Sequence, residues 1–213
     1  ILLFSASLVF LNFKAYKTSK LDSYVKSNIY KSNIFKDKYR ITYNEIKDKY
    51  SGFPELNALG GPIEHSLAMI AYTEGKYDIA MNHLNTAIKQ APNQQEHIGL
   101  KAVIFELNKK LKNRDSSKFY AEKAFTQKPS LLNMYNILKL SYYREKDTIS
   151  LEKLFNSHLK YRRGNSQGWV DKFNFYYSYK KDSLRASMVL DTALSIHRNN
   201  KTLLDYKKHL KFK

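Results

Sequence analysis

One short segment, residues 75–92, limits what this 213-residue chain can fold into more than any other. Gly75 permits a tight turn between two antiparallel helices, and Ala80 gives the small side chain that two closely crossing helices need. Leu84 and Ala87 then return to the same helix face after four and three residues. Pro92 ends the second helix, because proline has no N–H for a further helical turn. The spacing therefore predicts a pair of antiparallel helices.

The residues before this segment predict the first helix of the same pair. Pro62 lies in its opening turn, where the missing N–H costs no hydrogen bond, and Leu67 and Ala68 form its inner face. With Tyr77, these positions resemble the tetratricopeptide repeat, a helix pair that stacks on the next pair. The resemblance implies an all-α fold, an α-solenoid made as a right-handed stack of antiparallel helix pairs.

A second unit follows the first at nearly the standard interval. It carries Ala121 and Ala124 in its second helix and ends at Pro129. Pro129 follows Pro92 at slightly more than the ~34 residues of a standard repeat, so we expect a longer turn near positions 110–112.

Two more helix-pair units and the segments at both ends complete the predicted organisation of the chain. Bulky residues replace the small ones in the third unit, 131–161, whereas the fourth, 166–197, restores the pattern with Ala186, Leu190 and Ala193. The final helix is polar on one side, as a cap must be. The predicted parts are residues 1–13 as a truncated transmembrane helix or anchor, 14–60 as an N-terminal helical pair, 61–200 as about four repeats, and 201–213 as the capping helix.

The apolar run at 1–13 allows three interpretations. It is too short to cross a bilayer, which needs about 20 apolar residues. We favour a transmembrane helix cut by the start of the chain over a signal-peptide remnant or a buried core helix, because so few polar residues interrupt it. The chain begins with Ile1 and not methionine, so we expect either a piece of a longer product or a processed chain. Lys14 and Lys17 follow at once and place the repeats in the cytoplasm by the positive-inside tendency, with the periplasm as the alternative.

A second resemblance concerns what precedes the chain. Three features resemble the C-terminal repeat tails of O-antigen ligase/polymerase-like membrane proteins of Bacteroidetes-type bacteria. They are the segment 75–93, the segment RDSSKFYAEKAF at 114–125, and the apolar run before a lysine-rich helix. This resemblance implies an inner-membrane glycan transferase upstream of Ile1, with the present chain as its soluble tail. The catalytic residues of that family lie in membrane loops, so none can be assigned here.

Motifs for catalysis, cofactors and metals are missing from the sequence. It contains no Gly-x-Ser-x-Gly elbow, phosphate loop or dinucleotide fingerprint, and it has no cysteine. The six histidines lack a metal-binding spacing, and the paired carboxylates sit among lysines as helix ion pairs do. We therefore predict a non-catalytic protein without catalytic residues, cofactor or metal site.

The net charge of +18 raises the question of nucleic acid. The lysines are spread over nearly every predicted helix, and many of the aromatic residues fall at core positions, so a solvated basic surface is the favoured interpretation and nucleic acid an unlikely partner. A basic repeat that binds RNA or another polyanion is the alternative function. A third hypothesis is contact of the basic helix at 14–38 with a lipid-linked substrate.

The remaining candidate surface is the inner groove formed by the first helices of successive pairs. A mixed polar and aromatic trough suits an extended peptide or a partner helix. We expect a membrane-tethered interaction scaffold that binds a protein there, unless the chain's own N-terminal helices fill the groove. The predicted groove residues are His65, Met69, Tyr72, Glu96, Val103, Glu106, Asn133, Asn136, Tyr143, Arg144, Asp171, Phe175 and Tyr179.

Overall fold

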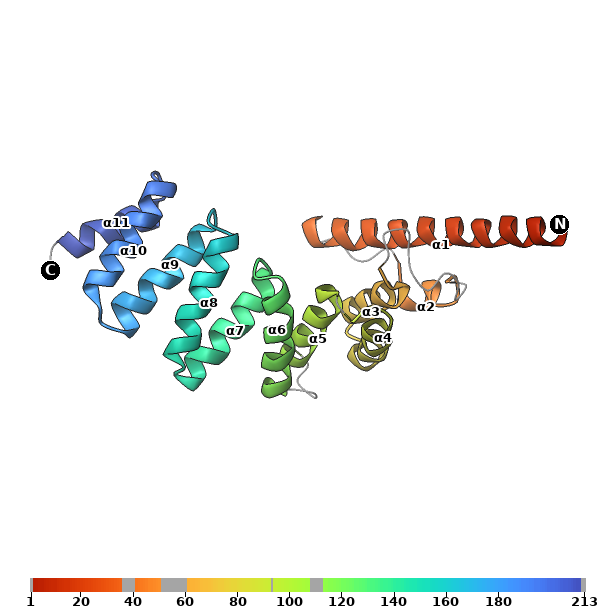
Figure 1. The fold of residues 1–213 in the computed structure, drawn as a ribbon, viewed down its shortest axis with the longest axis horizontal. Coiled ribbons are helices and arrows are strands. Elements are labelled where there is room, and N and C mark those ends of the chain that lie inside the picture. The colour runs from red at the N-terminus through yellow and green to blue at the C-terminus, as the bar shows by residue number, and fades with distance from the viewer. Residues whose placement is uncertain (1, 36–40, 51–60, 93, 108–112, 212–213) are drawn as a thin grey trace. The chain divides into compact units, whose positions relative to one another are not determined.

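The computed structural model describes residues 2–35, 41–50, 61–92, 94–107 and 113–211. These residues are helical and contain no β-strand, so the predicted all-α class is confirmed (Figure 1). Helices adjacent in sequence pack in pairs. The helices are α1 (Leu2–Phe35), α2 (Tyr43–Ile46), α3 (Ile63–Thr73), α4 (Tyr77–Gln90), α5 (Gln95–Leu107), α6 (Arg114–Gln127), α7 (Leu132–Glu145), α8 (Thr148–Tyr161), α9 (Ser166–Asn174), the π-helical turn η1 (Phe175–Tyr179), α10 (Ser183–Ile196) and α11 (Lys201–Lys211).

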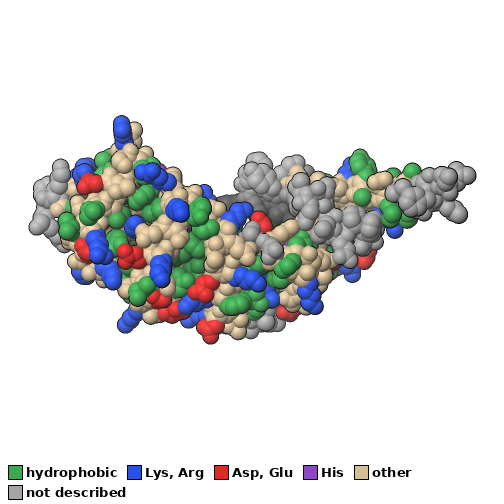
Figure 2. All heavy atoms as spheres, viewed as in Figure 1, with side chains coloured by type: hydrophobic (Ala, Val, Ile, Leu, Met, Phe, Trp, Pro, Cys, Tyr) green, Lys and Arg blue, Asp and Glu red, His purple; other side chains and the backbone are tan. Residues whose placement is uncertain are grey.

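The chain forms two compact units, which we call unit 1 (1–123) and unit 2 (124–213). The boundary falls inside α6. Figure 2 shows one face, on which the described lysine and arginine side chains are scattered over each unit among acidic and apolar ones. On that face the positive charge is dispersed, as the sequence indicated.

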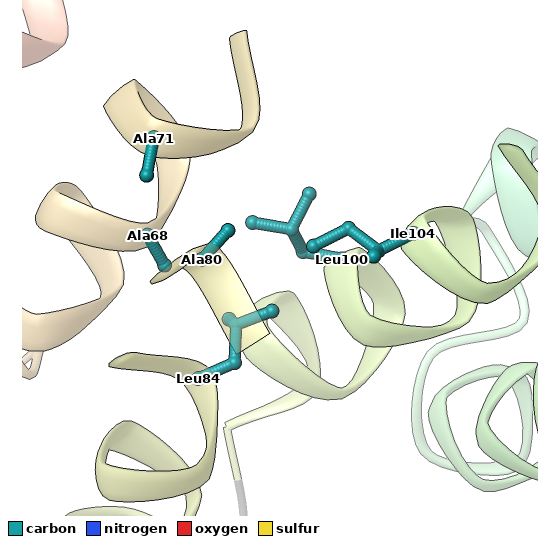
Figure 3. Packing of buried hydrophobic residues seen from close by; sticks show 6 residues of the cluster. All are labelled: Ala68, Ala71, Ala80, Leu84, Leu100 and Ile104. Atoms are coloured by element: carbon teal, nitrogen blue, oxygen red, sulfur yellow. The ribbon is translucent and has the colours of Figure 1, made fainter. Parts of the chain in front are cut away.

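The core of unit 1 contains the small residues that the sequence placed at the helix crossing. Ala68 and Ala71 on α3 and Ala80 on α4 have no exposed surface, and they share a cluster with Leu84 and a leucine and isoleucine of α5 (Figure 3). Alanine at the crossing lets the backbones of α3 and α4 approach closely. Burying a side chain such as Leu84 contributes ~1.5–3 kcal/mol.

Gly75 closes the turn between α3 and α4. Its φ of +73° lies in the left-handed region, which glycine adopts without the steric cost that a Cβ brings. The backbone N–H of the next residue, Lys76, donates to the carbonyl of Ala71 at 2.8 Å. The predicted tight turn is therefore confirmed in its geometry.

The N-terminal part of unit 1 packs on α3. Val25 of α1 and Ile46 of α2 are each 1% exposed and share a cluster with Leu67 and Ile70 of α3. The predicted division at residue 13 has no counterpart in a helix break, because α1 is continuous from Leu2 to Phe35. The longer turn predicted near positions 110–112 lies outside the described residues.

The N-terminal half of α1 exposes large apolar side chains. Val9, Phe10, Leu11 and Phe13 are 70%, 58%, 41% and 52% exposed. Among the described residues, no helix has the length and apolar character that a membrane span requires.

Unit 2 repeats the helix-pair arrangement with a bulkier core. Tyr135 of α7 and Phe155 of α8 are almost fully buried and their rings meet edge to face, with centroids 6.2 Å apart. In the next pair, Ala186, Leu190 and Ala193 of α10 are buried, as the sequence predicted. The helices α7 and α8 lie within the predicted third unit, 131–161, and α9, η1 and α10 lie within the predicted fourth, 166–197.

The turns within the two helix pairs of unit 2, α7–α8 and η1–α10, share one construction. Lys146 and Lys181 adopt a left-handed conformation, with φ of 56° and 57°, and each is followed by an aspartate that caps the next helix. Asp147 accepts a hydrogen bond from the Ser150 backbone N–H, and Asp182 accepts one from the N–H three residues further on. The same left-handed turn thus recurs at about one repeat length.

Lys146→Gly should stabilise unit 2 by ~0.5–1 kcal/mol. A residue with a Cβ costs about 1–2 kcal/mol in the left-handed region, and glycine does not bear this cost. Glycine loses more chain entropy on folding, but this loss is smaller than the steric cost that is removed. The matched control is Lys153→Gly, which places glycine inside α8 and should destabilise the unit by ~1 kcal/mol. Urea unfolding followed by the fluorescence of Trp169, the one tryptophan of the chain, measures both changes. A loss of stability in Lys146→Gly would contradict the turn geometry.

Candidate partner-binding surface

The predicted groove residues of α3 contact other parts of unit 1. Met69 is half-buried and packs against two clusters, one that contains Val25 of α1 and one formed with α4 and α5. The ring of His65 meets the buried ring of His97 edge-on, with centroids 5.4 Å apart. Tyr72 contacts the ring of Tyr77 on α4, and burial raises its pKa.

The groove residues of α5 differ in exposure. Glu96 is exposed near the start of the helix, whereas Val103 and Glu106 are half-buried. The helix packs on α4 and contacts α3.

In unit 2 a carboxylate joins the first helices of two successive pairs. Asp171 of α9 accepts hydrogen bonds through Oδ2 from the Tyr135 hydroxyl at 2.8 Å and from Lys139 Nζ at 2.6 Å. Its other oxygen, Oδ1, accepts from the Gln167 amide at 3.0 Å. One turn further along, the rings of Tyr143 and Tyr179 meet edge to face at 5.4 Å. Because α7 and η1 supply these two rings, the predicted residues Asp171, Tyr143 and Tyr179 lie along one contact line.

The Asp171 cluster is largely sheltered from water. The side chains of Asp171 and Lys139 are only 12% and 20% exposed, so their attraction is screened less than that of a surface ion pair. Burial, then the Asp171 charge, raises the pKa of Tyr135 well above its usual range. Burial, followed by Asp171 and Tyr179, raises the pKa of Tyr143 to about 12.

Asp171→Asn should lower the pKa of Tyr143, because it removes the negative charge that disfavours the phenolate. Tyrosine labelled with ¹³C at Cζ and titrated by NMR separates this residue from the other tyrosines. Asp205→Asn, which changes an exposed carboxylate on α11, is the control and should leave Tyr143 unaltered. An unchanged pKa of Tyr143 in Asp171→Asn would show that the two groups do not interact.

His158 supports this cluster from α8. Its ring stacks on Tyr135 with centroids 4.1 Å apart. Nδ1 lies 3.1 Å from the Pro129 carbonyl, which can only accept, so Nδ1 carries the proton. Nε2 then accepts from the Asn165 amide at 3.0 Å, and the oxygen of that amide accepts from the Gly168 N–H. Both ring nitrogens are satisfied in the neutral state, and burial lowers the pKa of His158.

Unit 2 should lose stability as the pH falls below about 6.5, the ordinary pKa of histidine. The unfolded chain then binds a proton that folded His158 resists, so its contribution is present above that pH and is lost as pH falls through the lowered folded value. The charges of Asp171, Lys139 and Arg162 also act on this ring. The dependence of stability on pH is therefore compared between the unaltered protein and His158→Gln. Urea midpoints from pH 7.5 to 5 measure it, and equal slopes in both proteins would contradict the assignment.

The remaining predicted residues of unit 2 are exposed, with one exception. Asn133, Asn136 and Arg144 are exposed on α7. Phe175 was expected in the groove, but the structure buries it completely against the ring of Phe155, with centroids 5.4 Å apart. The ring contributes to the core because burial of so much apolar surface is favourable, and it is not available to a partner.

Two exposed leucines on α7 were missing from the predicted site. Leu132 and Leu140 are 42% and 53% exposed. They alternate with Asn136 and Arg144 at intervals of four residues, which places all four side chains on one helix face. This stripe lies next to the α7 face that carries Lys139 and contacts Asp171. The i, i+4 spacing of leucines among polar residues could have revealed it.

A second cluster, in unit 1, also escaped the sequence analysis. His83 of α4 lies in hydrogen-bond contact through Nδ1 with the Glu64 carboxylate and, at 2.8 Å through Nε2, with the Tyr43 hydroxyl. Carboxylate, imidazole and hydroxyl in series is an arrangement that can activate a nucleophile. Burial and the Glu64 charge raise the pKa of Tyr43, however, so the phenol stays protonated and is a poor nucleophile. The cluster instead fastens α2 to the α3–α4 pair.

Among the described residues, no three or more histidine and acidic side chains gather where they could hold a metal ion. The Asp171 cluster and the α7 stripe offer hydrogen-bonding groups, aromatic edges and exposed leucines. Comparison with known proteins adds nothing to this description: no protein-family model matches the chain, and no curated protein matches it.

Proposed function

We propose that the chain is a tetratricopeptide-type α-solenoid that acts as a membrane-tethered, non-catalytic scaffold and binds a protein partner through unit 2. The binding surface consists of the α7 stripe (Leu132, Asn136, Leu140 and Arg144) with Tyr143, Tyr179 and the edge of the Asp171 cluster. The partner is an extended peptide or a helix that presents apolar side chains to the two leucines.

Two features support the repeat type. Small residues occupy the α3–α4 crossing, and a left-handed residue closes the turns at Gly75, Lys146 and Lys181. A periodic turn and a periodic crossing are what a stack of similar helix pairs requires.

The observation that carries the binding proposal is the pairing of first helices in unit 2. Tyr135 and Lys139 of α7 bind Asp171 of α9, and Tyr143 contacts Tyr179. These contacts join α7 to α9 and η1 of the next helix pair. Beside them, two exposed leucines of α7 lie among polar side chains. Exposed apolar side chains rimmed by polar ones are typical of protein interaction sites.

Selection of peptides from a random library on the full chain tests the binding surface. Leu140→Asp should weaken the selected peptides by about ten-fold or more, because a charge in the centre of an apolar contact is desolvated without a partner. Ile149→Asp, at a side chain 68% exposed on α8, is the matched control and should change little. Equal effects of the two substitutions would place the binding site elsewhere.

The N-terminal half of α1 supports the tether. Phe10 and Phe13 are exposed, and the amines of Lys14 and Lys17 lie 4.7 and 4.4 Å above those two rings. A lysine whose side chain lies along a neighbouring aromatic ring can place its amine at the anionic headgroups while the ring enters the bilayer. Further along the same helix, Thr18, Asp22 and Val25 are buried, and Val25 packs on α3.

Flotation with vesicles of phosphatidylcholine, alone or mixed with phosphatidylglycerol, tests the tether. The full chain should float with both and more strongly with the mixture, and Phe10→Glu combined with Phe13→Glu should reduce this by about ten-fold or more. Tyr24→Glu, which changes another exposed aromatic of α1, is the control. Flotation that survives the double substitution would exclude this segment as the anchor.

The basic composition keeps polyanion binding as a second candidate. A salt titration separates the two functions: binding of an RNA oligonucleotide should weaken steeply between low and moderate salt, whereas docking of the selected peptide should change much less.

A further inference from the structure

A pocket of about 130 Å³ lies in unit 2, where α9 and η1 meet α11. Three aromatic rings form its wall. The ring of Phe173 stacks on Tyr177, with centroids 5.4 Å apart and 15° between the planes, and on Tyr206, at 4.7 Å and 17°. The pocket includes none of the residues of the binding surface described above, so it is a separate feature of the same unit.

The π-helical turn η1 shapes this pocket. The N–H of Lys180 donates to the carbonyl of Phe175, five residues back, at 2.9 Å, so the turn holds one more residue than an α-helical turn. Tyr177 and Ser178 of this turn stand at the pocket. Single π turns within α-helices are uncommon and occur frequently at functional sites.

Polar groups line the pocket beside the rings. They are the side chains of Asn174, Ser178 and His209. None of the three makes a side-chain hydrogen bond with the described residues of the chain. Their donors and acceptors are available to a ligand.

Size and charge together decide the ligand class. Pockets for drug-sized molecules measure ~300–1,000 Å³, so 130 Å³ accepts one side chain. Between Lys172 and Lys211 the sequence has nine lysines and arginines against three aspartates, and the exposed Lys180 and Lys181 adjoin the pocket in sequence. We propose that the pocket binds an acidic peptide that inserts one aromatic side chain against the Phe173–Tyr177–Tyr206 stack.

Calorimetric titration of the full chain with three synthetic peptides tests this site. The first is a phenylalanine flanked on each side by two glutamates, the second has alanine in place of phenylalanine, and the third has lysines in place of the glutamates; all have blocked ends. The first should bind at least about ten-fold more tightly than either of the others, a difference of ~1.4 kcal/mol. This result would show that the peptide needs both its aromatic ring, for stacking, and its negative charge for tight binding.

Variants locate the binding. Ser178→Trp fills the mouth of the pocket from an exposed position and should reduce affinity for the first peptide by about ten-fold or more. Met188→Trp, at a side chain 62% exposed on α10, should not, and neither should Leu140→Asp, which tests the separate surface. Circular dichroism confirms that each variant is folded. The proposal is overturned by absence of binding at millimolar peptide, by equal affinities of the phenylalanine and alanine peptides, by tighter binding of the lysine peptide, or by full affinity in Ser178→Trp.

Discussion

Phe155→Ala should lower the free energy of unfolding of unit 2 by ~3–5 kcal/mol. The ring has no exposed surface and lies between Tyr135 of α7 and Phe175 of η1, so it joins the two helix pairs of the unit. Its removal takes away buried apolar area and leaves a cavity that two large rings cannot close. Urea unfolding followed by Trp169 fluorescence, whose indole is 7% exposed in the same unit, measures the loss.

Ile149→Ala is the matched control for this substitution. Ile149 lies on the same helix but is 68% exposed, so its truncation should change stability by less than about 0.5 kcal/mol. If both substitutions cost the same, the packing of α8 against its neighbours would differ from that described.

Ala80→Leu should destabilise unit 1 by ~1–3 kcal/mol, although leucine is as good a helix former as most residues. Ala80 has no exposed surface and packs beside Ala68 and Ala71 at the crossing of α3 and α4. Three added carbon atoms must push the helices apart or force strained rotamers.

The effect of Ala80→Leu is measured by amide hydrogen exchange in α3 and α4, which reports on this unit alone. Asn82→Leu, at an exposed position two residues along, is the control and should leave protection nearly unchanged. Unaltered exchange in Ala80→Leu would show that the crossing has room for a larger residue.

The helices could be predicted from the sequence because their signals are local. The segment 148–161 was expected as a helix and is α8, preceded by the capping side chain of Asp147. Apolar periodicity and caps depend on residues within a few positions of one another. The recurring Lys-Asp dipeptides at 146–147 and 181–182 carried further information, which became clear only with the left-handed φ of each lysine.

The candidate site was predictable only in part, because it depends on how separate helices pack. Asp171 was assigned to the groove, but Lys139 was not, and their ion pair joins residues on two different helix pairs. The contact between His83 and Glu64 was missed for the same reason. The π turn at 175–179 gave no signal, since its aromatic residues also suit an α-helix.

The resemblance to O-antigen ligase-like membrane proteins is based on the order and the residues of a few sequence segments, and it stays a prediction. The inner-membrane location and the cytoplasmic orientation of the repeats depend on it and on the lysines after the apolar run.

Nuclear Overhauser effects between aromatic rings of unit 2 test most directly whether the helix pairs form a progressive stack. The account predicts contacts between neighbours along the chain: Tyr135 with His158, Phe155 with Phe175, and Phe173 with Tyr206. It predicts none between the rings of α7 and Tyr206 of α11. Strong effects between α7 and α11 would show a bundle in which distant helices interleave, and would contradict the scaffold.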